Sequence, residues 1–301
     1  MFDTVVRSWF HRSLPPGAAM SAPAPDATAE PAPPTAAAEA PIRSAWPAGR
    51  LDLAHRLWGD GFIFPGGEID TLRLARPLGM SAAASLLLVG VGSGGPAITI
   101  ARNLGAWVTA TDDDPALLAS AQAQVNHAQL GKKISINSWD PDEPNFAAKG
   151  HHHCLALDPF RNAQPEPILD RLTGALKPGG QIVITSLAAP KPLDPDDRTV
   201  RRWAELERRD PAELLAPVTV TRMLGRMGLD VRVAEDTSQS HIEHALLGWR
   251  VMLRDLDRKP TRREAVPMIA EAELWLLRRR LIDDGRLRMM RWHAISRLPI
   301  V

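Results

Sequence analysis

The stretch LLLVGVGSGG, residues 86 to 95, decides how this chain is read. An apolar run that leads straight into glycines is typical of a buried strand ending in a tight turn. The glycines satisfy two spacings at once, Gly90-x-Gly92-x-x-Gly95 and Gly90-x-Gly92-x-Gly94. Both spacings occur where a backbone loop approaches a bound nucleotide closely and a helix begins directly after the loop. The stretch therefore predicts a strand, a turn and a helix around a nucleotide-type ligand.

The composition of the chain limits the kinds of partner. The 301 residues are 45% hydrophobic and carry a net charge of +1, so a sizeable core is expected and neither nucleic acid nor an anionic membrane is indicated as the main partner. The single cysteine, Cys154, excludes an intramolecular disulfide framework and suits a reducing compartment. No run approaches the roughly 20 apolar residues that a membrane-spanning helix needs. We expect a cytoplasmic protein that acts on small molecules.

The N-terminal part differs in composition from the rest. Residues 21 to 41 hold 15 Ala or Pro out of 21 and no large aliphatic or aromatic residue, so we expect residues 1 to 45 to be a disordered tether. The first residues, MFDTVVRSWF, lack the features of a signal peptide. Two interpretations of these residues stay open: a frayed tail, or a short amphipathic segment with weak membrane contact. One folded domain is expected over residues 46 to 301.

Strand and helix signals alternate after residue 85. Apolar or alternating runs predict strands over 85–92, 106–112, 133–140, 153–160, 181–188, 229–236 and 288–297. Capped amphipathic stretches predict helices over 96–105, 114–131, 168–176 and 218–228, with KPGG, residues 177 to 180, as a turn. Strands joined by helices predict a doubly wound α/β fold with a mainly parallel, seven-stranded sheet, helical insertions and helices on both faces.

Asp112 supplies the second half of the nucleotide signal. It lies 22 residues after Gly90, at the end of the second predicted strand, where a carboxylate accepts hydrogen bonds from ribose hydroxyls. Ligands of doubly wound sheets bind outside the carboxyl ends of the strands. Loop and acid together predict a nucleotide-type site, but they do not by themselves separate NAD from S-adenosylmethionine.

The order of segments around the loop resembles a known family. LLLVGVGSGGPAITIARNLGAWVTATDDDP, then SWDPDEPNF, then LKPGGQIVITSL are similar to class I S-adenosylmethionine-dependent methyltransferases over nearly all of residues 85 to 240. The resemblance implies a Rossmann-like methyltransferase fold with S-adenosylmethionine as cofactor. It also implies roles in cofactor binding for Gly90, Gly92 and Gly94 near the methionine part, Asp112 at the ribose, Asp113 near the adenosine, Trp139 and Asp140 at the adenine, and Asp158 beside the substrate or the sulfonium.

A narrower resemblance covers the segment before the glycine loop. LWGDGFIFPGGEIDTLRLARPLGM, residues 57 to 80, is similar to the segment that covers the cofactor in phosphoethanolamine-type and related small-molecule methyltransferases. The resemblance implies a lid, in which Phe62 and Phe64 exclude water while Gly66 and Gly67 let the chain fold over the site. The alternative is a hydrophobic N-terminal helix and turn that pack against the sheet.

Two further histidines are candidates for acid–base chemistry. EDTSQSHIEHALLGWRVMLRDL resembles the substrate-binding segment after the sixth strand in the same group, and we expect a helical insertion over residues 243 to 287. His241 and His244 are three residues apart, so they share a helix face, and a histidine can take a proton near neutral pH. The alternative interpretation is that both histidines are simply polar residues at the start of a helix. The arginines at 278 to 280 are expected on a solvated face at the end of a later helix, and binding of an acidic substrate or a lipid headgroup is the alternative.

The HHHC run, residues 151 to 154, does not indicate a metal site. Neighbouring residues of a strand point to opposite faces, so these four side chains do not converge on one ion. We therefore expect no bound metal.

The sequence favours one function and leaves two rivals. The predicted activity is transfer of a methyl group from S-adenosylmethionine to a small-molecule acceptor. A methyltransferase fold that serves only as a binding or scaffold protein is the first rival, favoured by Leu88, which stands where the family often has an acid, and by the absence of tyrosine. An NAD-dependent oxidoreductase is the second rival, and it predicts NAD binding without methyl transfer.

Overall fold

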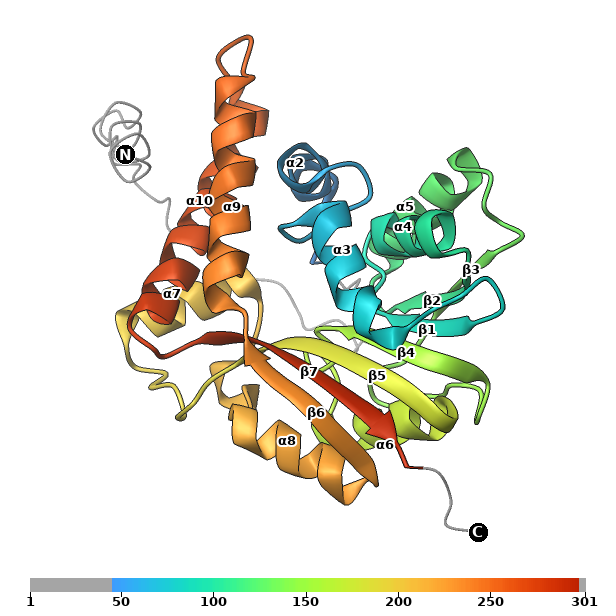
Figure 1. The fold of residues 1–301 in the computed structure, drawn as a ribbon. Helices are drawn as coiled ribbons and strands as arrows, with labels where there is room; N and C mark the ends of the chain where they lie inside the picture. The colour runs from blue at the N-terminus through green and yellow to red at the C-terminus, as the bar shows by residue number, and fades with distance from the viewer. Residues whose placement is uncertain (1–44, 298–301) are drawn as a thin grey trace, which may run out of the picture. The chain divides into compact units, whose positions relative to one another are not determined.

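A seven-stranded sheet organises the protein. The computed structural model describes residues 45–297. The strands follow the order β3-β2-β1-β4-β5-β7-β6, in which β7 runs antiparallel to both of its neighbours and the other described pairs are parallel. The predicted mainly parallel, doubly wound α/β sheet is thereby confirmed (Figure 1). The predicted tether lies almost wholly outside the described residues.

The strands and helices have the following bounds. The strands are β1 Ser85–Val89, β2 Trp107–Asp112, β3 Ile134–Ser138, β4 His151–Leu157, β5 Leu176–Ala188, β6 Leu229–Asp236 and β7 Arg288–Ser296. The α-helices are α2 Ala48–Trp58, α3 Gly67–Ala75, α4 Gly95–Leu104, α5 Pro115–His127, α6 Pro165–Ala175, α7 Arg198–Glu207, α8 Pro217–Arg226, α9 Ser238–Arg254 and α10 Arg262–Asp283. Two short 3-10 helices are η1 Arg76–Leu78 and η2 Pro211–Glu213.

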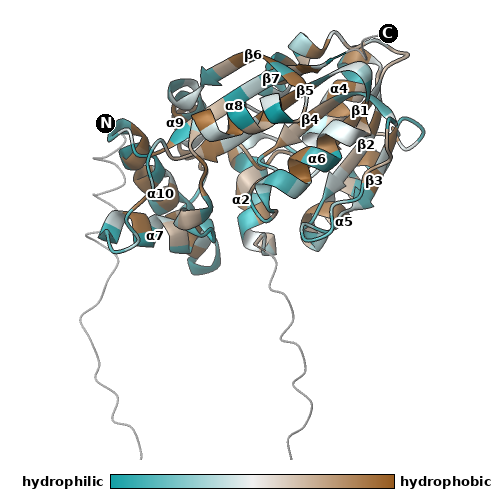
Figure 2. Ribbon diagram, turned by 90° about the horizontal axis from the view of Figure 1, so that it is seen from below, coloured by the Kyte–Doolittle hydropathy of each residue, from teal (hydrophilic) through white to brown (hydrophobic). Residues whose placement is uncertain are grey.

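Strand β1 is apolar on both sides and is buried on both faces of the sheet. Leu87 and Val89 pack with α6 and α8 on one face, and Leu86 and Leu88 pack with α3, α4 and α5 on the other. Figure 2 shows the first of these faces, with α6 and α8 lying across the strands. Leu88 is fully buried, so the position where the family often has an acid belongs here to the core.

A third group of helices stands beyond the carboxyl end of β5. Trp203 of α7 is fully buried in a cluster that includes Leu274 and Leu281 of α10 and Leu187 of β5. Helices α9 and α10 form the helical insertion and rise from this end of the sheet (Figure 1). The insertion starts at Ser238, earlier than the expected residue 243.

The structure corrects two expectations about local structure. KPGG belongs to strand β5, because β5 begins directly after α6 and its pairing with β4 shifts from His151–Leu176 to His153–Gln181, which leaves these residues as an irregularity in the strand. The second correction concerns the arginines of α10. Arg278 is only 8% exposed, because it lies on the face of α10 that packs inward.

Within residues 45–297, no helix combines the length and the apolar character that crossing a membrane requires. The N-terminal segment for which membrane contact was considered lies outside this range.

Candidate functional site

A cavity of about 210 Å³ opens at the carboxyl ends of the central strands. Residues at the ends of β1, β2, β4 and β5 form its floor, and residues from the segment before α3, from α9 and from α10 form its walls. Its lining includes Gly90 and Asp112 at one end and His241 and Arg278 at the other. The predicted nucleotide loop and the helical insertion therefore face one common space.

Gly90 is the glycine that the geometry requires most clearly. Its φ is +76°, and a Cβ atom at this position would lie 2.2 Å from the carbonyl oxygen of Leu157. Its N–H donates to the carbonyl oxygen of Thr111 at 2.9 Å, which ties the loop to the end of β2. Only glycine lets the chain turn here between two neighbouring strands.

Of the three loop glycines, only Gly90 lines the cavity. The N–H of Gly92 donates to Oδ2 of Asp112 at 2.8 Å, and Ile63 occupies the space beside its Cα atom. Gly94 adopts a φ of +97° before the first turn of α4 and packs against Ala121. Gly92 and Gly94 thus shape the loop in this structure, while the contacts expected with a methionine moiety stay a prediction.

Asp112 lies at the end of β2, on the cavity wall, and is only 4% exposed. Its Oδ1 accepts from the N–H of Asp114 at 3.2 Å, while its Oδ2 accepts from Gly92. Burial raises the pKa of Asp112 to about 7, and the two backbone hydrogen bonds oppose that rise. A carboxylate held by backbone donors at the mouth of a glycine loop can accept further hydrogen bonds from a ribose.

Some of the remaining residues predicted for cofactor binding line the cavity, and others do not. Asp113 lines the cavity and accepts a hydrogen bond from Asn162, and Trp139 lines the cavity as well. Asp140 does not line it, because its Oδ1 accepts from the N–H of Asp142 at 2.9 Å on an exposed turn. Asp140 and Trp139 share a shallow hollow on the outside of this turn.

The segment expected to act as a lid lies directly against the glycine loop. The carbonyl oxygen of Gly61 accepts from the N–H of Gly95 at 2.8 Å, which satisfies a backbone donor at the start of α4. Phe64 lines the cavity, whereas Phe62 is buried and packs edge-on against Phe64 with ring centroids 6.1 Å apart.

Gly66 and Gly67 do not line the cavity, and both have positive φ where the chain turns into α3. The C-terminal part of the predicted lid, around Leu78, is buried in the core instead. Part of the segment thus faces the cavity and part of it packs against the fold, while its role as a lid stays a prediction.

Asp158 is at the end of β4 in a left-handed backbone conformation, with φ +51°. Its carboxylate accepts from Nη1 of Arg209 at 3.1 and 2.9 Å and from the hydroxyl of Ser186 at 2.6 Å. Burial alone would raise the pKa of Asp158, but Arg209, Arg161 and the Ser186 hydroxyl hold it below its ordinary value. Asp158 is therefore ionised and already engaged by protein groups.

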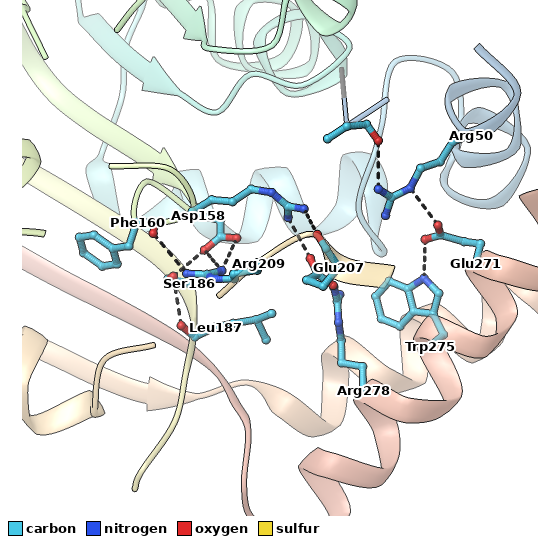
Figure 3. Close-up of polar contacts among 12 residues, drawn as sticks. Arg50, Asp158, Phe160, Ser186, Leu187, Glu207, Arg209, Glu271, Trp275 and Arg278 are labelled. Carbon is cyan, nitrogen blue, oxygen red and sulfur yellow. Dashed lines mark hydrogen bonds and ion pairs between the residues drawn. The ribbon is translucent and has the colours of Figure 1, made fainter. Parts of the chain in front are cut away.

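A buried ionic cluster forms the far end of the cavity (Figure 3). Glu207, the last residue of α7, is 1% exposed and accepts from Nη1 of Arg161 at 2.9 Å and from Nη2 of Arg278. Nη2 of Arg161 also donates to the backbone carbonyl of Glu207 at 2.6 Å. Burial opposes ionisation, but the two guanidinium groups lower the pKa of Glu207 to about 2. A second pair joins Arg50 of α2 to Glu271 of α10 at 3.0 Å.

His241 and His244 lie on α9 in different surroundings. His241 lines the cavity, with its Nε2 atom 3.3 Å from Nη1 of Arg278. Burial, followed by the nearby Arg278 charge, lowers the pKa of His241 to about 3, so the ring is neutral. His244 does not line the cavity, and its Nδ1 atom lies 2.8 Å from Oδ2 of Asp70. The geometry thus brings only His241 to the site, and because arginine can only donate, Nε2 of His241 acts there as an acceptor.

Comparisons with known proteins agree with the strand order and the glycine loop. No model of a known protein family matches the chain. The curated phosphoethanolamine N-methyltransferase 2 of Caenorhabditis elegans is 27% identical over 137 residues, which are 45% of this chain and 31% of that protein. A solved structure of phosphoethanolamine N-methyltransferase 2 from Haemonchus contortus in complex with S-adenosyl-L-methionine superposes with a TM-score of 0.72 at 20% identity, over 82% of this chain and 56% of that one.

The chain has the class I S-adenosylmethionine-dependent methyltransferase fold. The antiparallel β7 between β5 and β6 distinguishes this fold from the dinucleotide-binding order 3-2-1-4-5-6. A putative sarcosine dimethylglycine methyltransferase from Galdieria sulphuraria matches with a TM-score of 0.64 at 14% identity, over 83% of this chain and 98% of that one. The resemblance stated from the sequence is thus confirmed for the fold. The chain spans about a third of the curated relative and just over half of the Haemonchus structure.

Sequence reasoning did not find the ionic cluster of this methyltransferase fold. Glu207 and Arg209 lie in the run AELERRD, and Arg278 lies in RRR, and both runs look like solvated charged surface. Their partners are distant in the chain, since Arg161 precedes Glu207 by 46 residues and Arg278 follows it by 71. Within residues 45–297, no three His, Cys, Asp or Glu side chains are grouped as metal ligands.

Proposed function

We propose that the chain transfers a methyl group from S-adenosylmethionine to a small-molecule acceptor. The observation that carries this proposal is the meeting of Gly90 and Asp112 in a cavity that continues past Asp158 to the insertion helices. The first end has the backbone approach and the acid that a nucleoside needs, and the second end offers space and polar groups for another molecule. The comparisons support the proposal through relatives that are methyltransferases of small molecules.

The residues present fit the cofactor. Gly90 leaves its backbone uncovered where any Cβ atom would collide, Asp112 faces the cavity, and the buried indole Nε1 of Trp139 has no hydrogen-bond partner in the described structure. In this proposal Asp112 holds the ribose, with Asp113 and Trp139 beside the adenosine. Asp140 belongs to the adenine contacts only if its exposed turn closes on the ligand.

The chemistry requires alignment more than acid–base catalysis. Bound S-adenosylmethionine supplies an electrophilic methyl group on a sulfonium, which an acceptor attacks in line. The protein then has to orient the acceptor and exclude water. Phe64 and Ile63 of the segment before α3 close one side of the cavity, which supports a lid role for residues 57–80.

The surroundings of His241 favour a role in positioning the acceptor over a role in proton transfer. Its ring is neutral, and its Nε2 atom already contacts Arg278. His244 would act on the site through Asp70, which lines the cavity. We place the protein in the cytoplasm as part of the same proposal, on the basis of its single, buried cysteine.

Ligand binding to the purified chain tests the proposal. Isothermal titration with S-adenosylmethionine, S-adenosylhomocysteine and NAD should give micromolar affinity for the first two and none for NAD. Asp112→Ala should weaken binding at least about tenfold, because hydrogen bonds to a charged group are lost. Asp230→Ala, which removes an exposed acid of β6 paired with Arg232, is the matched control and should leave the affinity unchanged.

Each alternative function has its own signature in this experiment. Binding of NAD instead would support the oxidoreductase. If none of the three ligands binds, the result would favour a methyltransferase fold that serves only as a binding or scaffold protein. Binding of S-adenosylmethionine without turnover in an acceptor screen would indicate a fold that has kept its cofactor and lost its reaction.

A further inference from the structure

The buried ionic cluster at the far end of the cavity holds more positive than negative charge. Two guanidinium groups, those of Arg161 and Arg278, share the single carboxylate of Glu207. The other ion pairs around the cavity match one arginine with one acid, as in Arg50 with Glu271 and Arg209 with Asp158. The two guanidinium groups at Glu207 therefore share one directly paired carboxylate.

The excess charge is located most clearly at Arg278. Arg161 also experiences the charges of Asp158 and Asp113, which lie toward the cofactor end. Within the described part of the chain, Glu207 is the sole ion-pair partner of Arg278. The neighbouring His241 is neutral and provides no compensating charge.

Arg278 is held rigidly where it lines the cavity. Arg278 is 8% exposed, and its guanidinium stacks on the ring of Trp275, with Cζ 4.4 Å from the ring centroid. One edge of the guanidinium donates to Glu207, and Nη1 lies 3.3 Å from Nε2 of His241. Its buried Nε–H has no partner among residues 45–297.

A buried cation with an unused donor beside a cavity is costly unless a ligand completes its pairing. The fixed, stacked guanidinium costs little further ordering when it binds a planar anion.

We propose that the methyl acceptor carries a single carboxylate group, which Arg278 binds at the far end of the cavity together with Arg161. This inference rests on the proposed methyl transfer and specifies its substrate class. Glu207 is a positioning residue, since it holds both guanidinium groups in place without meeting the acceptor. One negative charge matches the one excess positive charge, whereas a phosphate dianion would leave the buried cluster with a net negative charge.

Small probes test the proposal independently of the rest of the acceptor. Acetate, the isosteric and neutral acetamide, and inorganic phosphate are titrated onto the full chain loaded with S-adenosylhomocysteine, and binding is followed by NMR line broadening of each probe. Acetate should bind at least about tenfold more tightly than acetamide and more tightly than phosphate, because charge-assisted hydrogen bonds to a buried guanidinium favour the monoanion.

Variants assign the site to its residues. Arg278→Gln should weaken acetate binding about tenfold to a hundredfold. Arg278→Lys keeps the charge and should lose less. Arg254→Gln changes an arginine of α9 that is exposed and paired with Asp255, so it is the matched control and should bind acetate like the unchanged protein.

Three results would overturn the inference: equal binding of acetate and acetamide, tighter binding of phosphate than of acetate, or an unchanged acetate affinity in a folded Arg278→Gln variant. Its failure is separable from failure of the proposed function, because the affinity for S-adenosylhomocysteine is measured first for each protein. If the unchanged chain does not bind S-adenosylhomocysteine, the methyltransferase proposal is contradicted. Retained affinity without selective acetate binding contradicts only the carboxylate site.

Discussion

Single residues decide the geometry of the cofactor end of the cavity. Gly90 turns the chain between β2 and β4, and Asp112 receives the N–H of Gly92, so loop and acid stabilise one another. Gly90 directly follows β1 and Asp112 ends β2, the neighbouring strand of the same sheet, which explains why a spacing along the chain becomes a contact in space. Changes at these residues should therefore affect both folding and binding.

Gly90→Ala should destabilise the protein by about 2 to 4 kcal/mol, because an alanine is strained at positive φ and its Cβ atom meets backbone that cannot move aside. Gly131→Ala is the control, since a Cβ atom there meets nothing within 4 Å and its φ is not in the left-handed region. Urea denaturation measures both free energies of unfolding. A Gly90→Ala variant as stable as Gly131→Ala would contradict the close approach to Leu157.

Asp112 should make cofactor binding depend on pH. Its ionised form is the better acceptor for ribose hydroxyls, and its pKa of about 7 means that half of the free protein holds the carboxyl group protonated at that pH. The affinity for S-adenosylhomocysteine should rise with pH through about 7 and level off about one pH unit higher. Titrations from about pH 5.5 to about 8.5 test this, and Asp112→Asn should remove the dependence that is specific to this group.

The same shift has the opposite consequence for the stability of the free protein. A raised carboxyl pKa means that the folded state binds more protons than the unfolded state between pH 3.8 and about 7. This contribution therefore favours folding at low pH and is lost as the pH rises through that window. A flat affinity profile in the unchanged protein would contradict the raised pKa.

Whole elements bring together the walls of the cavity. Helix α7 ends at Glu207, whose carboxylate forms ion pairs with Arg161 of the segment after β4 and with Arg278 of α10. Helix α2 is joined to α10 by Arg50 and Glu271, and Glu271 also accepts from the indole N–H of Trp275 at 3.0 Å. Elements far apart in the chain are thus linked through buried charges, which demand specific partners more than apolar contacts do.

The segment before α3 should respond to the ligand as one unit. Binding of S-adenosylhomocysteine should slow amide hydrogen exchange over residues 57–80, because Gly61 and Ile63 rest on the glycine loop that the ligand orders. Helix α8, which does not line the cavity, is the internal control and should gain only the protection that follows from overall stabilisation, less than residues 57–80 gain. Equal protection of both segments would indicate global stabilisation and not a lid.

At the scale of the molecule, one cavity collects residues from Ala45 to Met289. The sheet, the segment before α3 and the insertion helices all contribute to its lining, so the site exists only when most of the described chain is folded. Ligand binding should therefore stabilise the fold as a whole.

S-adenosylhomocysteine at a hundredfold excess over its dissociation constant should stabilise the folded state by about 2.7 kcal/mol. For a domain of this size that corresponds to a rise in Tm of about 5 to 10 °C, measured by differential scanning calorimetry. The transition should stay single, because residues from most of the described chain form the lining of the one cavity. A second transition whose midpoint does not move with ligand would show that part of the fold is independent of the site.

The sequence by itself determined the sheet, the glycine turn and the acid at its edge. Hydrophobic runs between glycines, such as the one before Gly90, reflect local rules of strand and turn formation, and the distance from Gly90 to Asp112 follows from one strand–helix–strand unit. Only the tertiary structure decided that Glu207, Arg161 and Arg278 meet. Local pattern cannot indicate a buried charge, because a charged run looks the same on a solvated face and in an ion pair until its distant partners are placed.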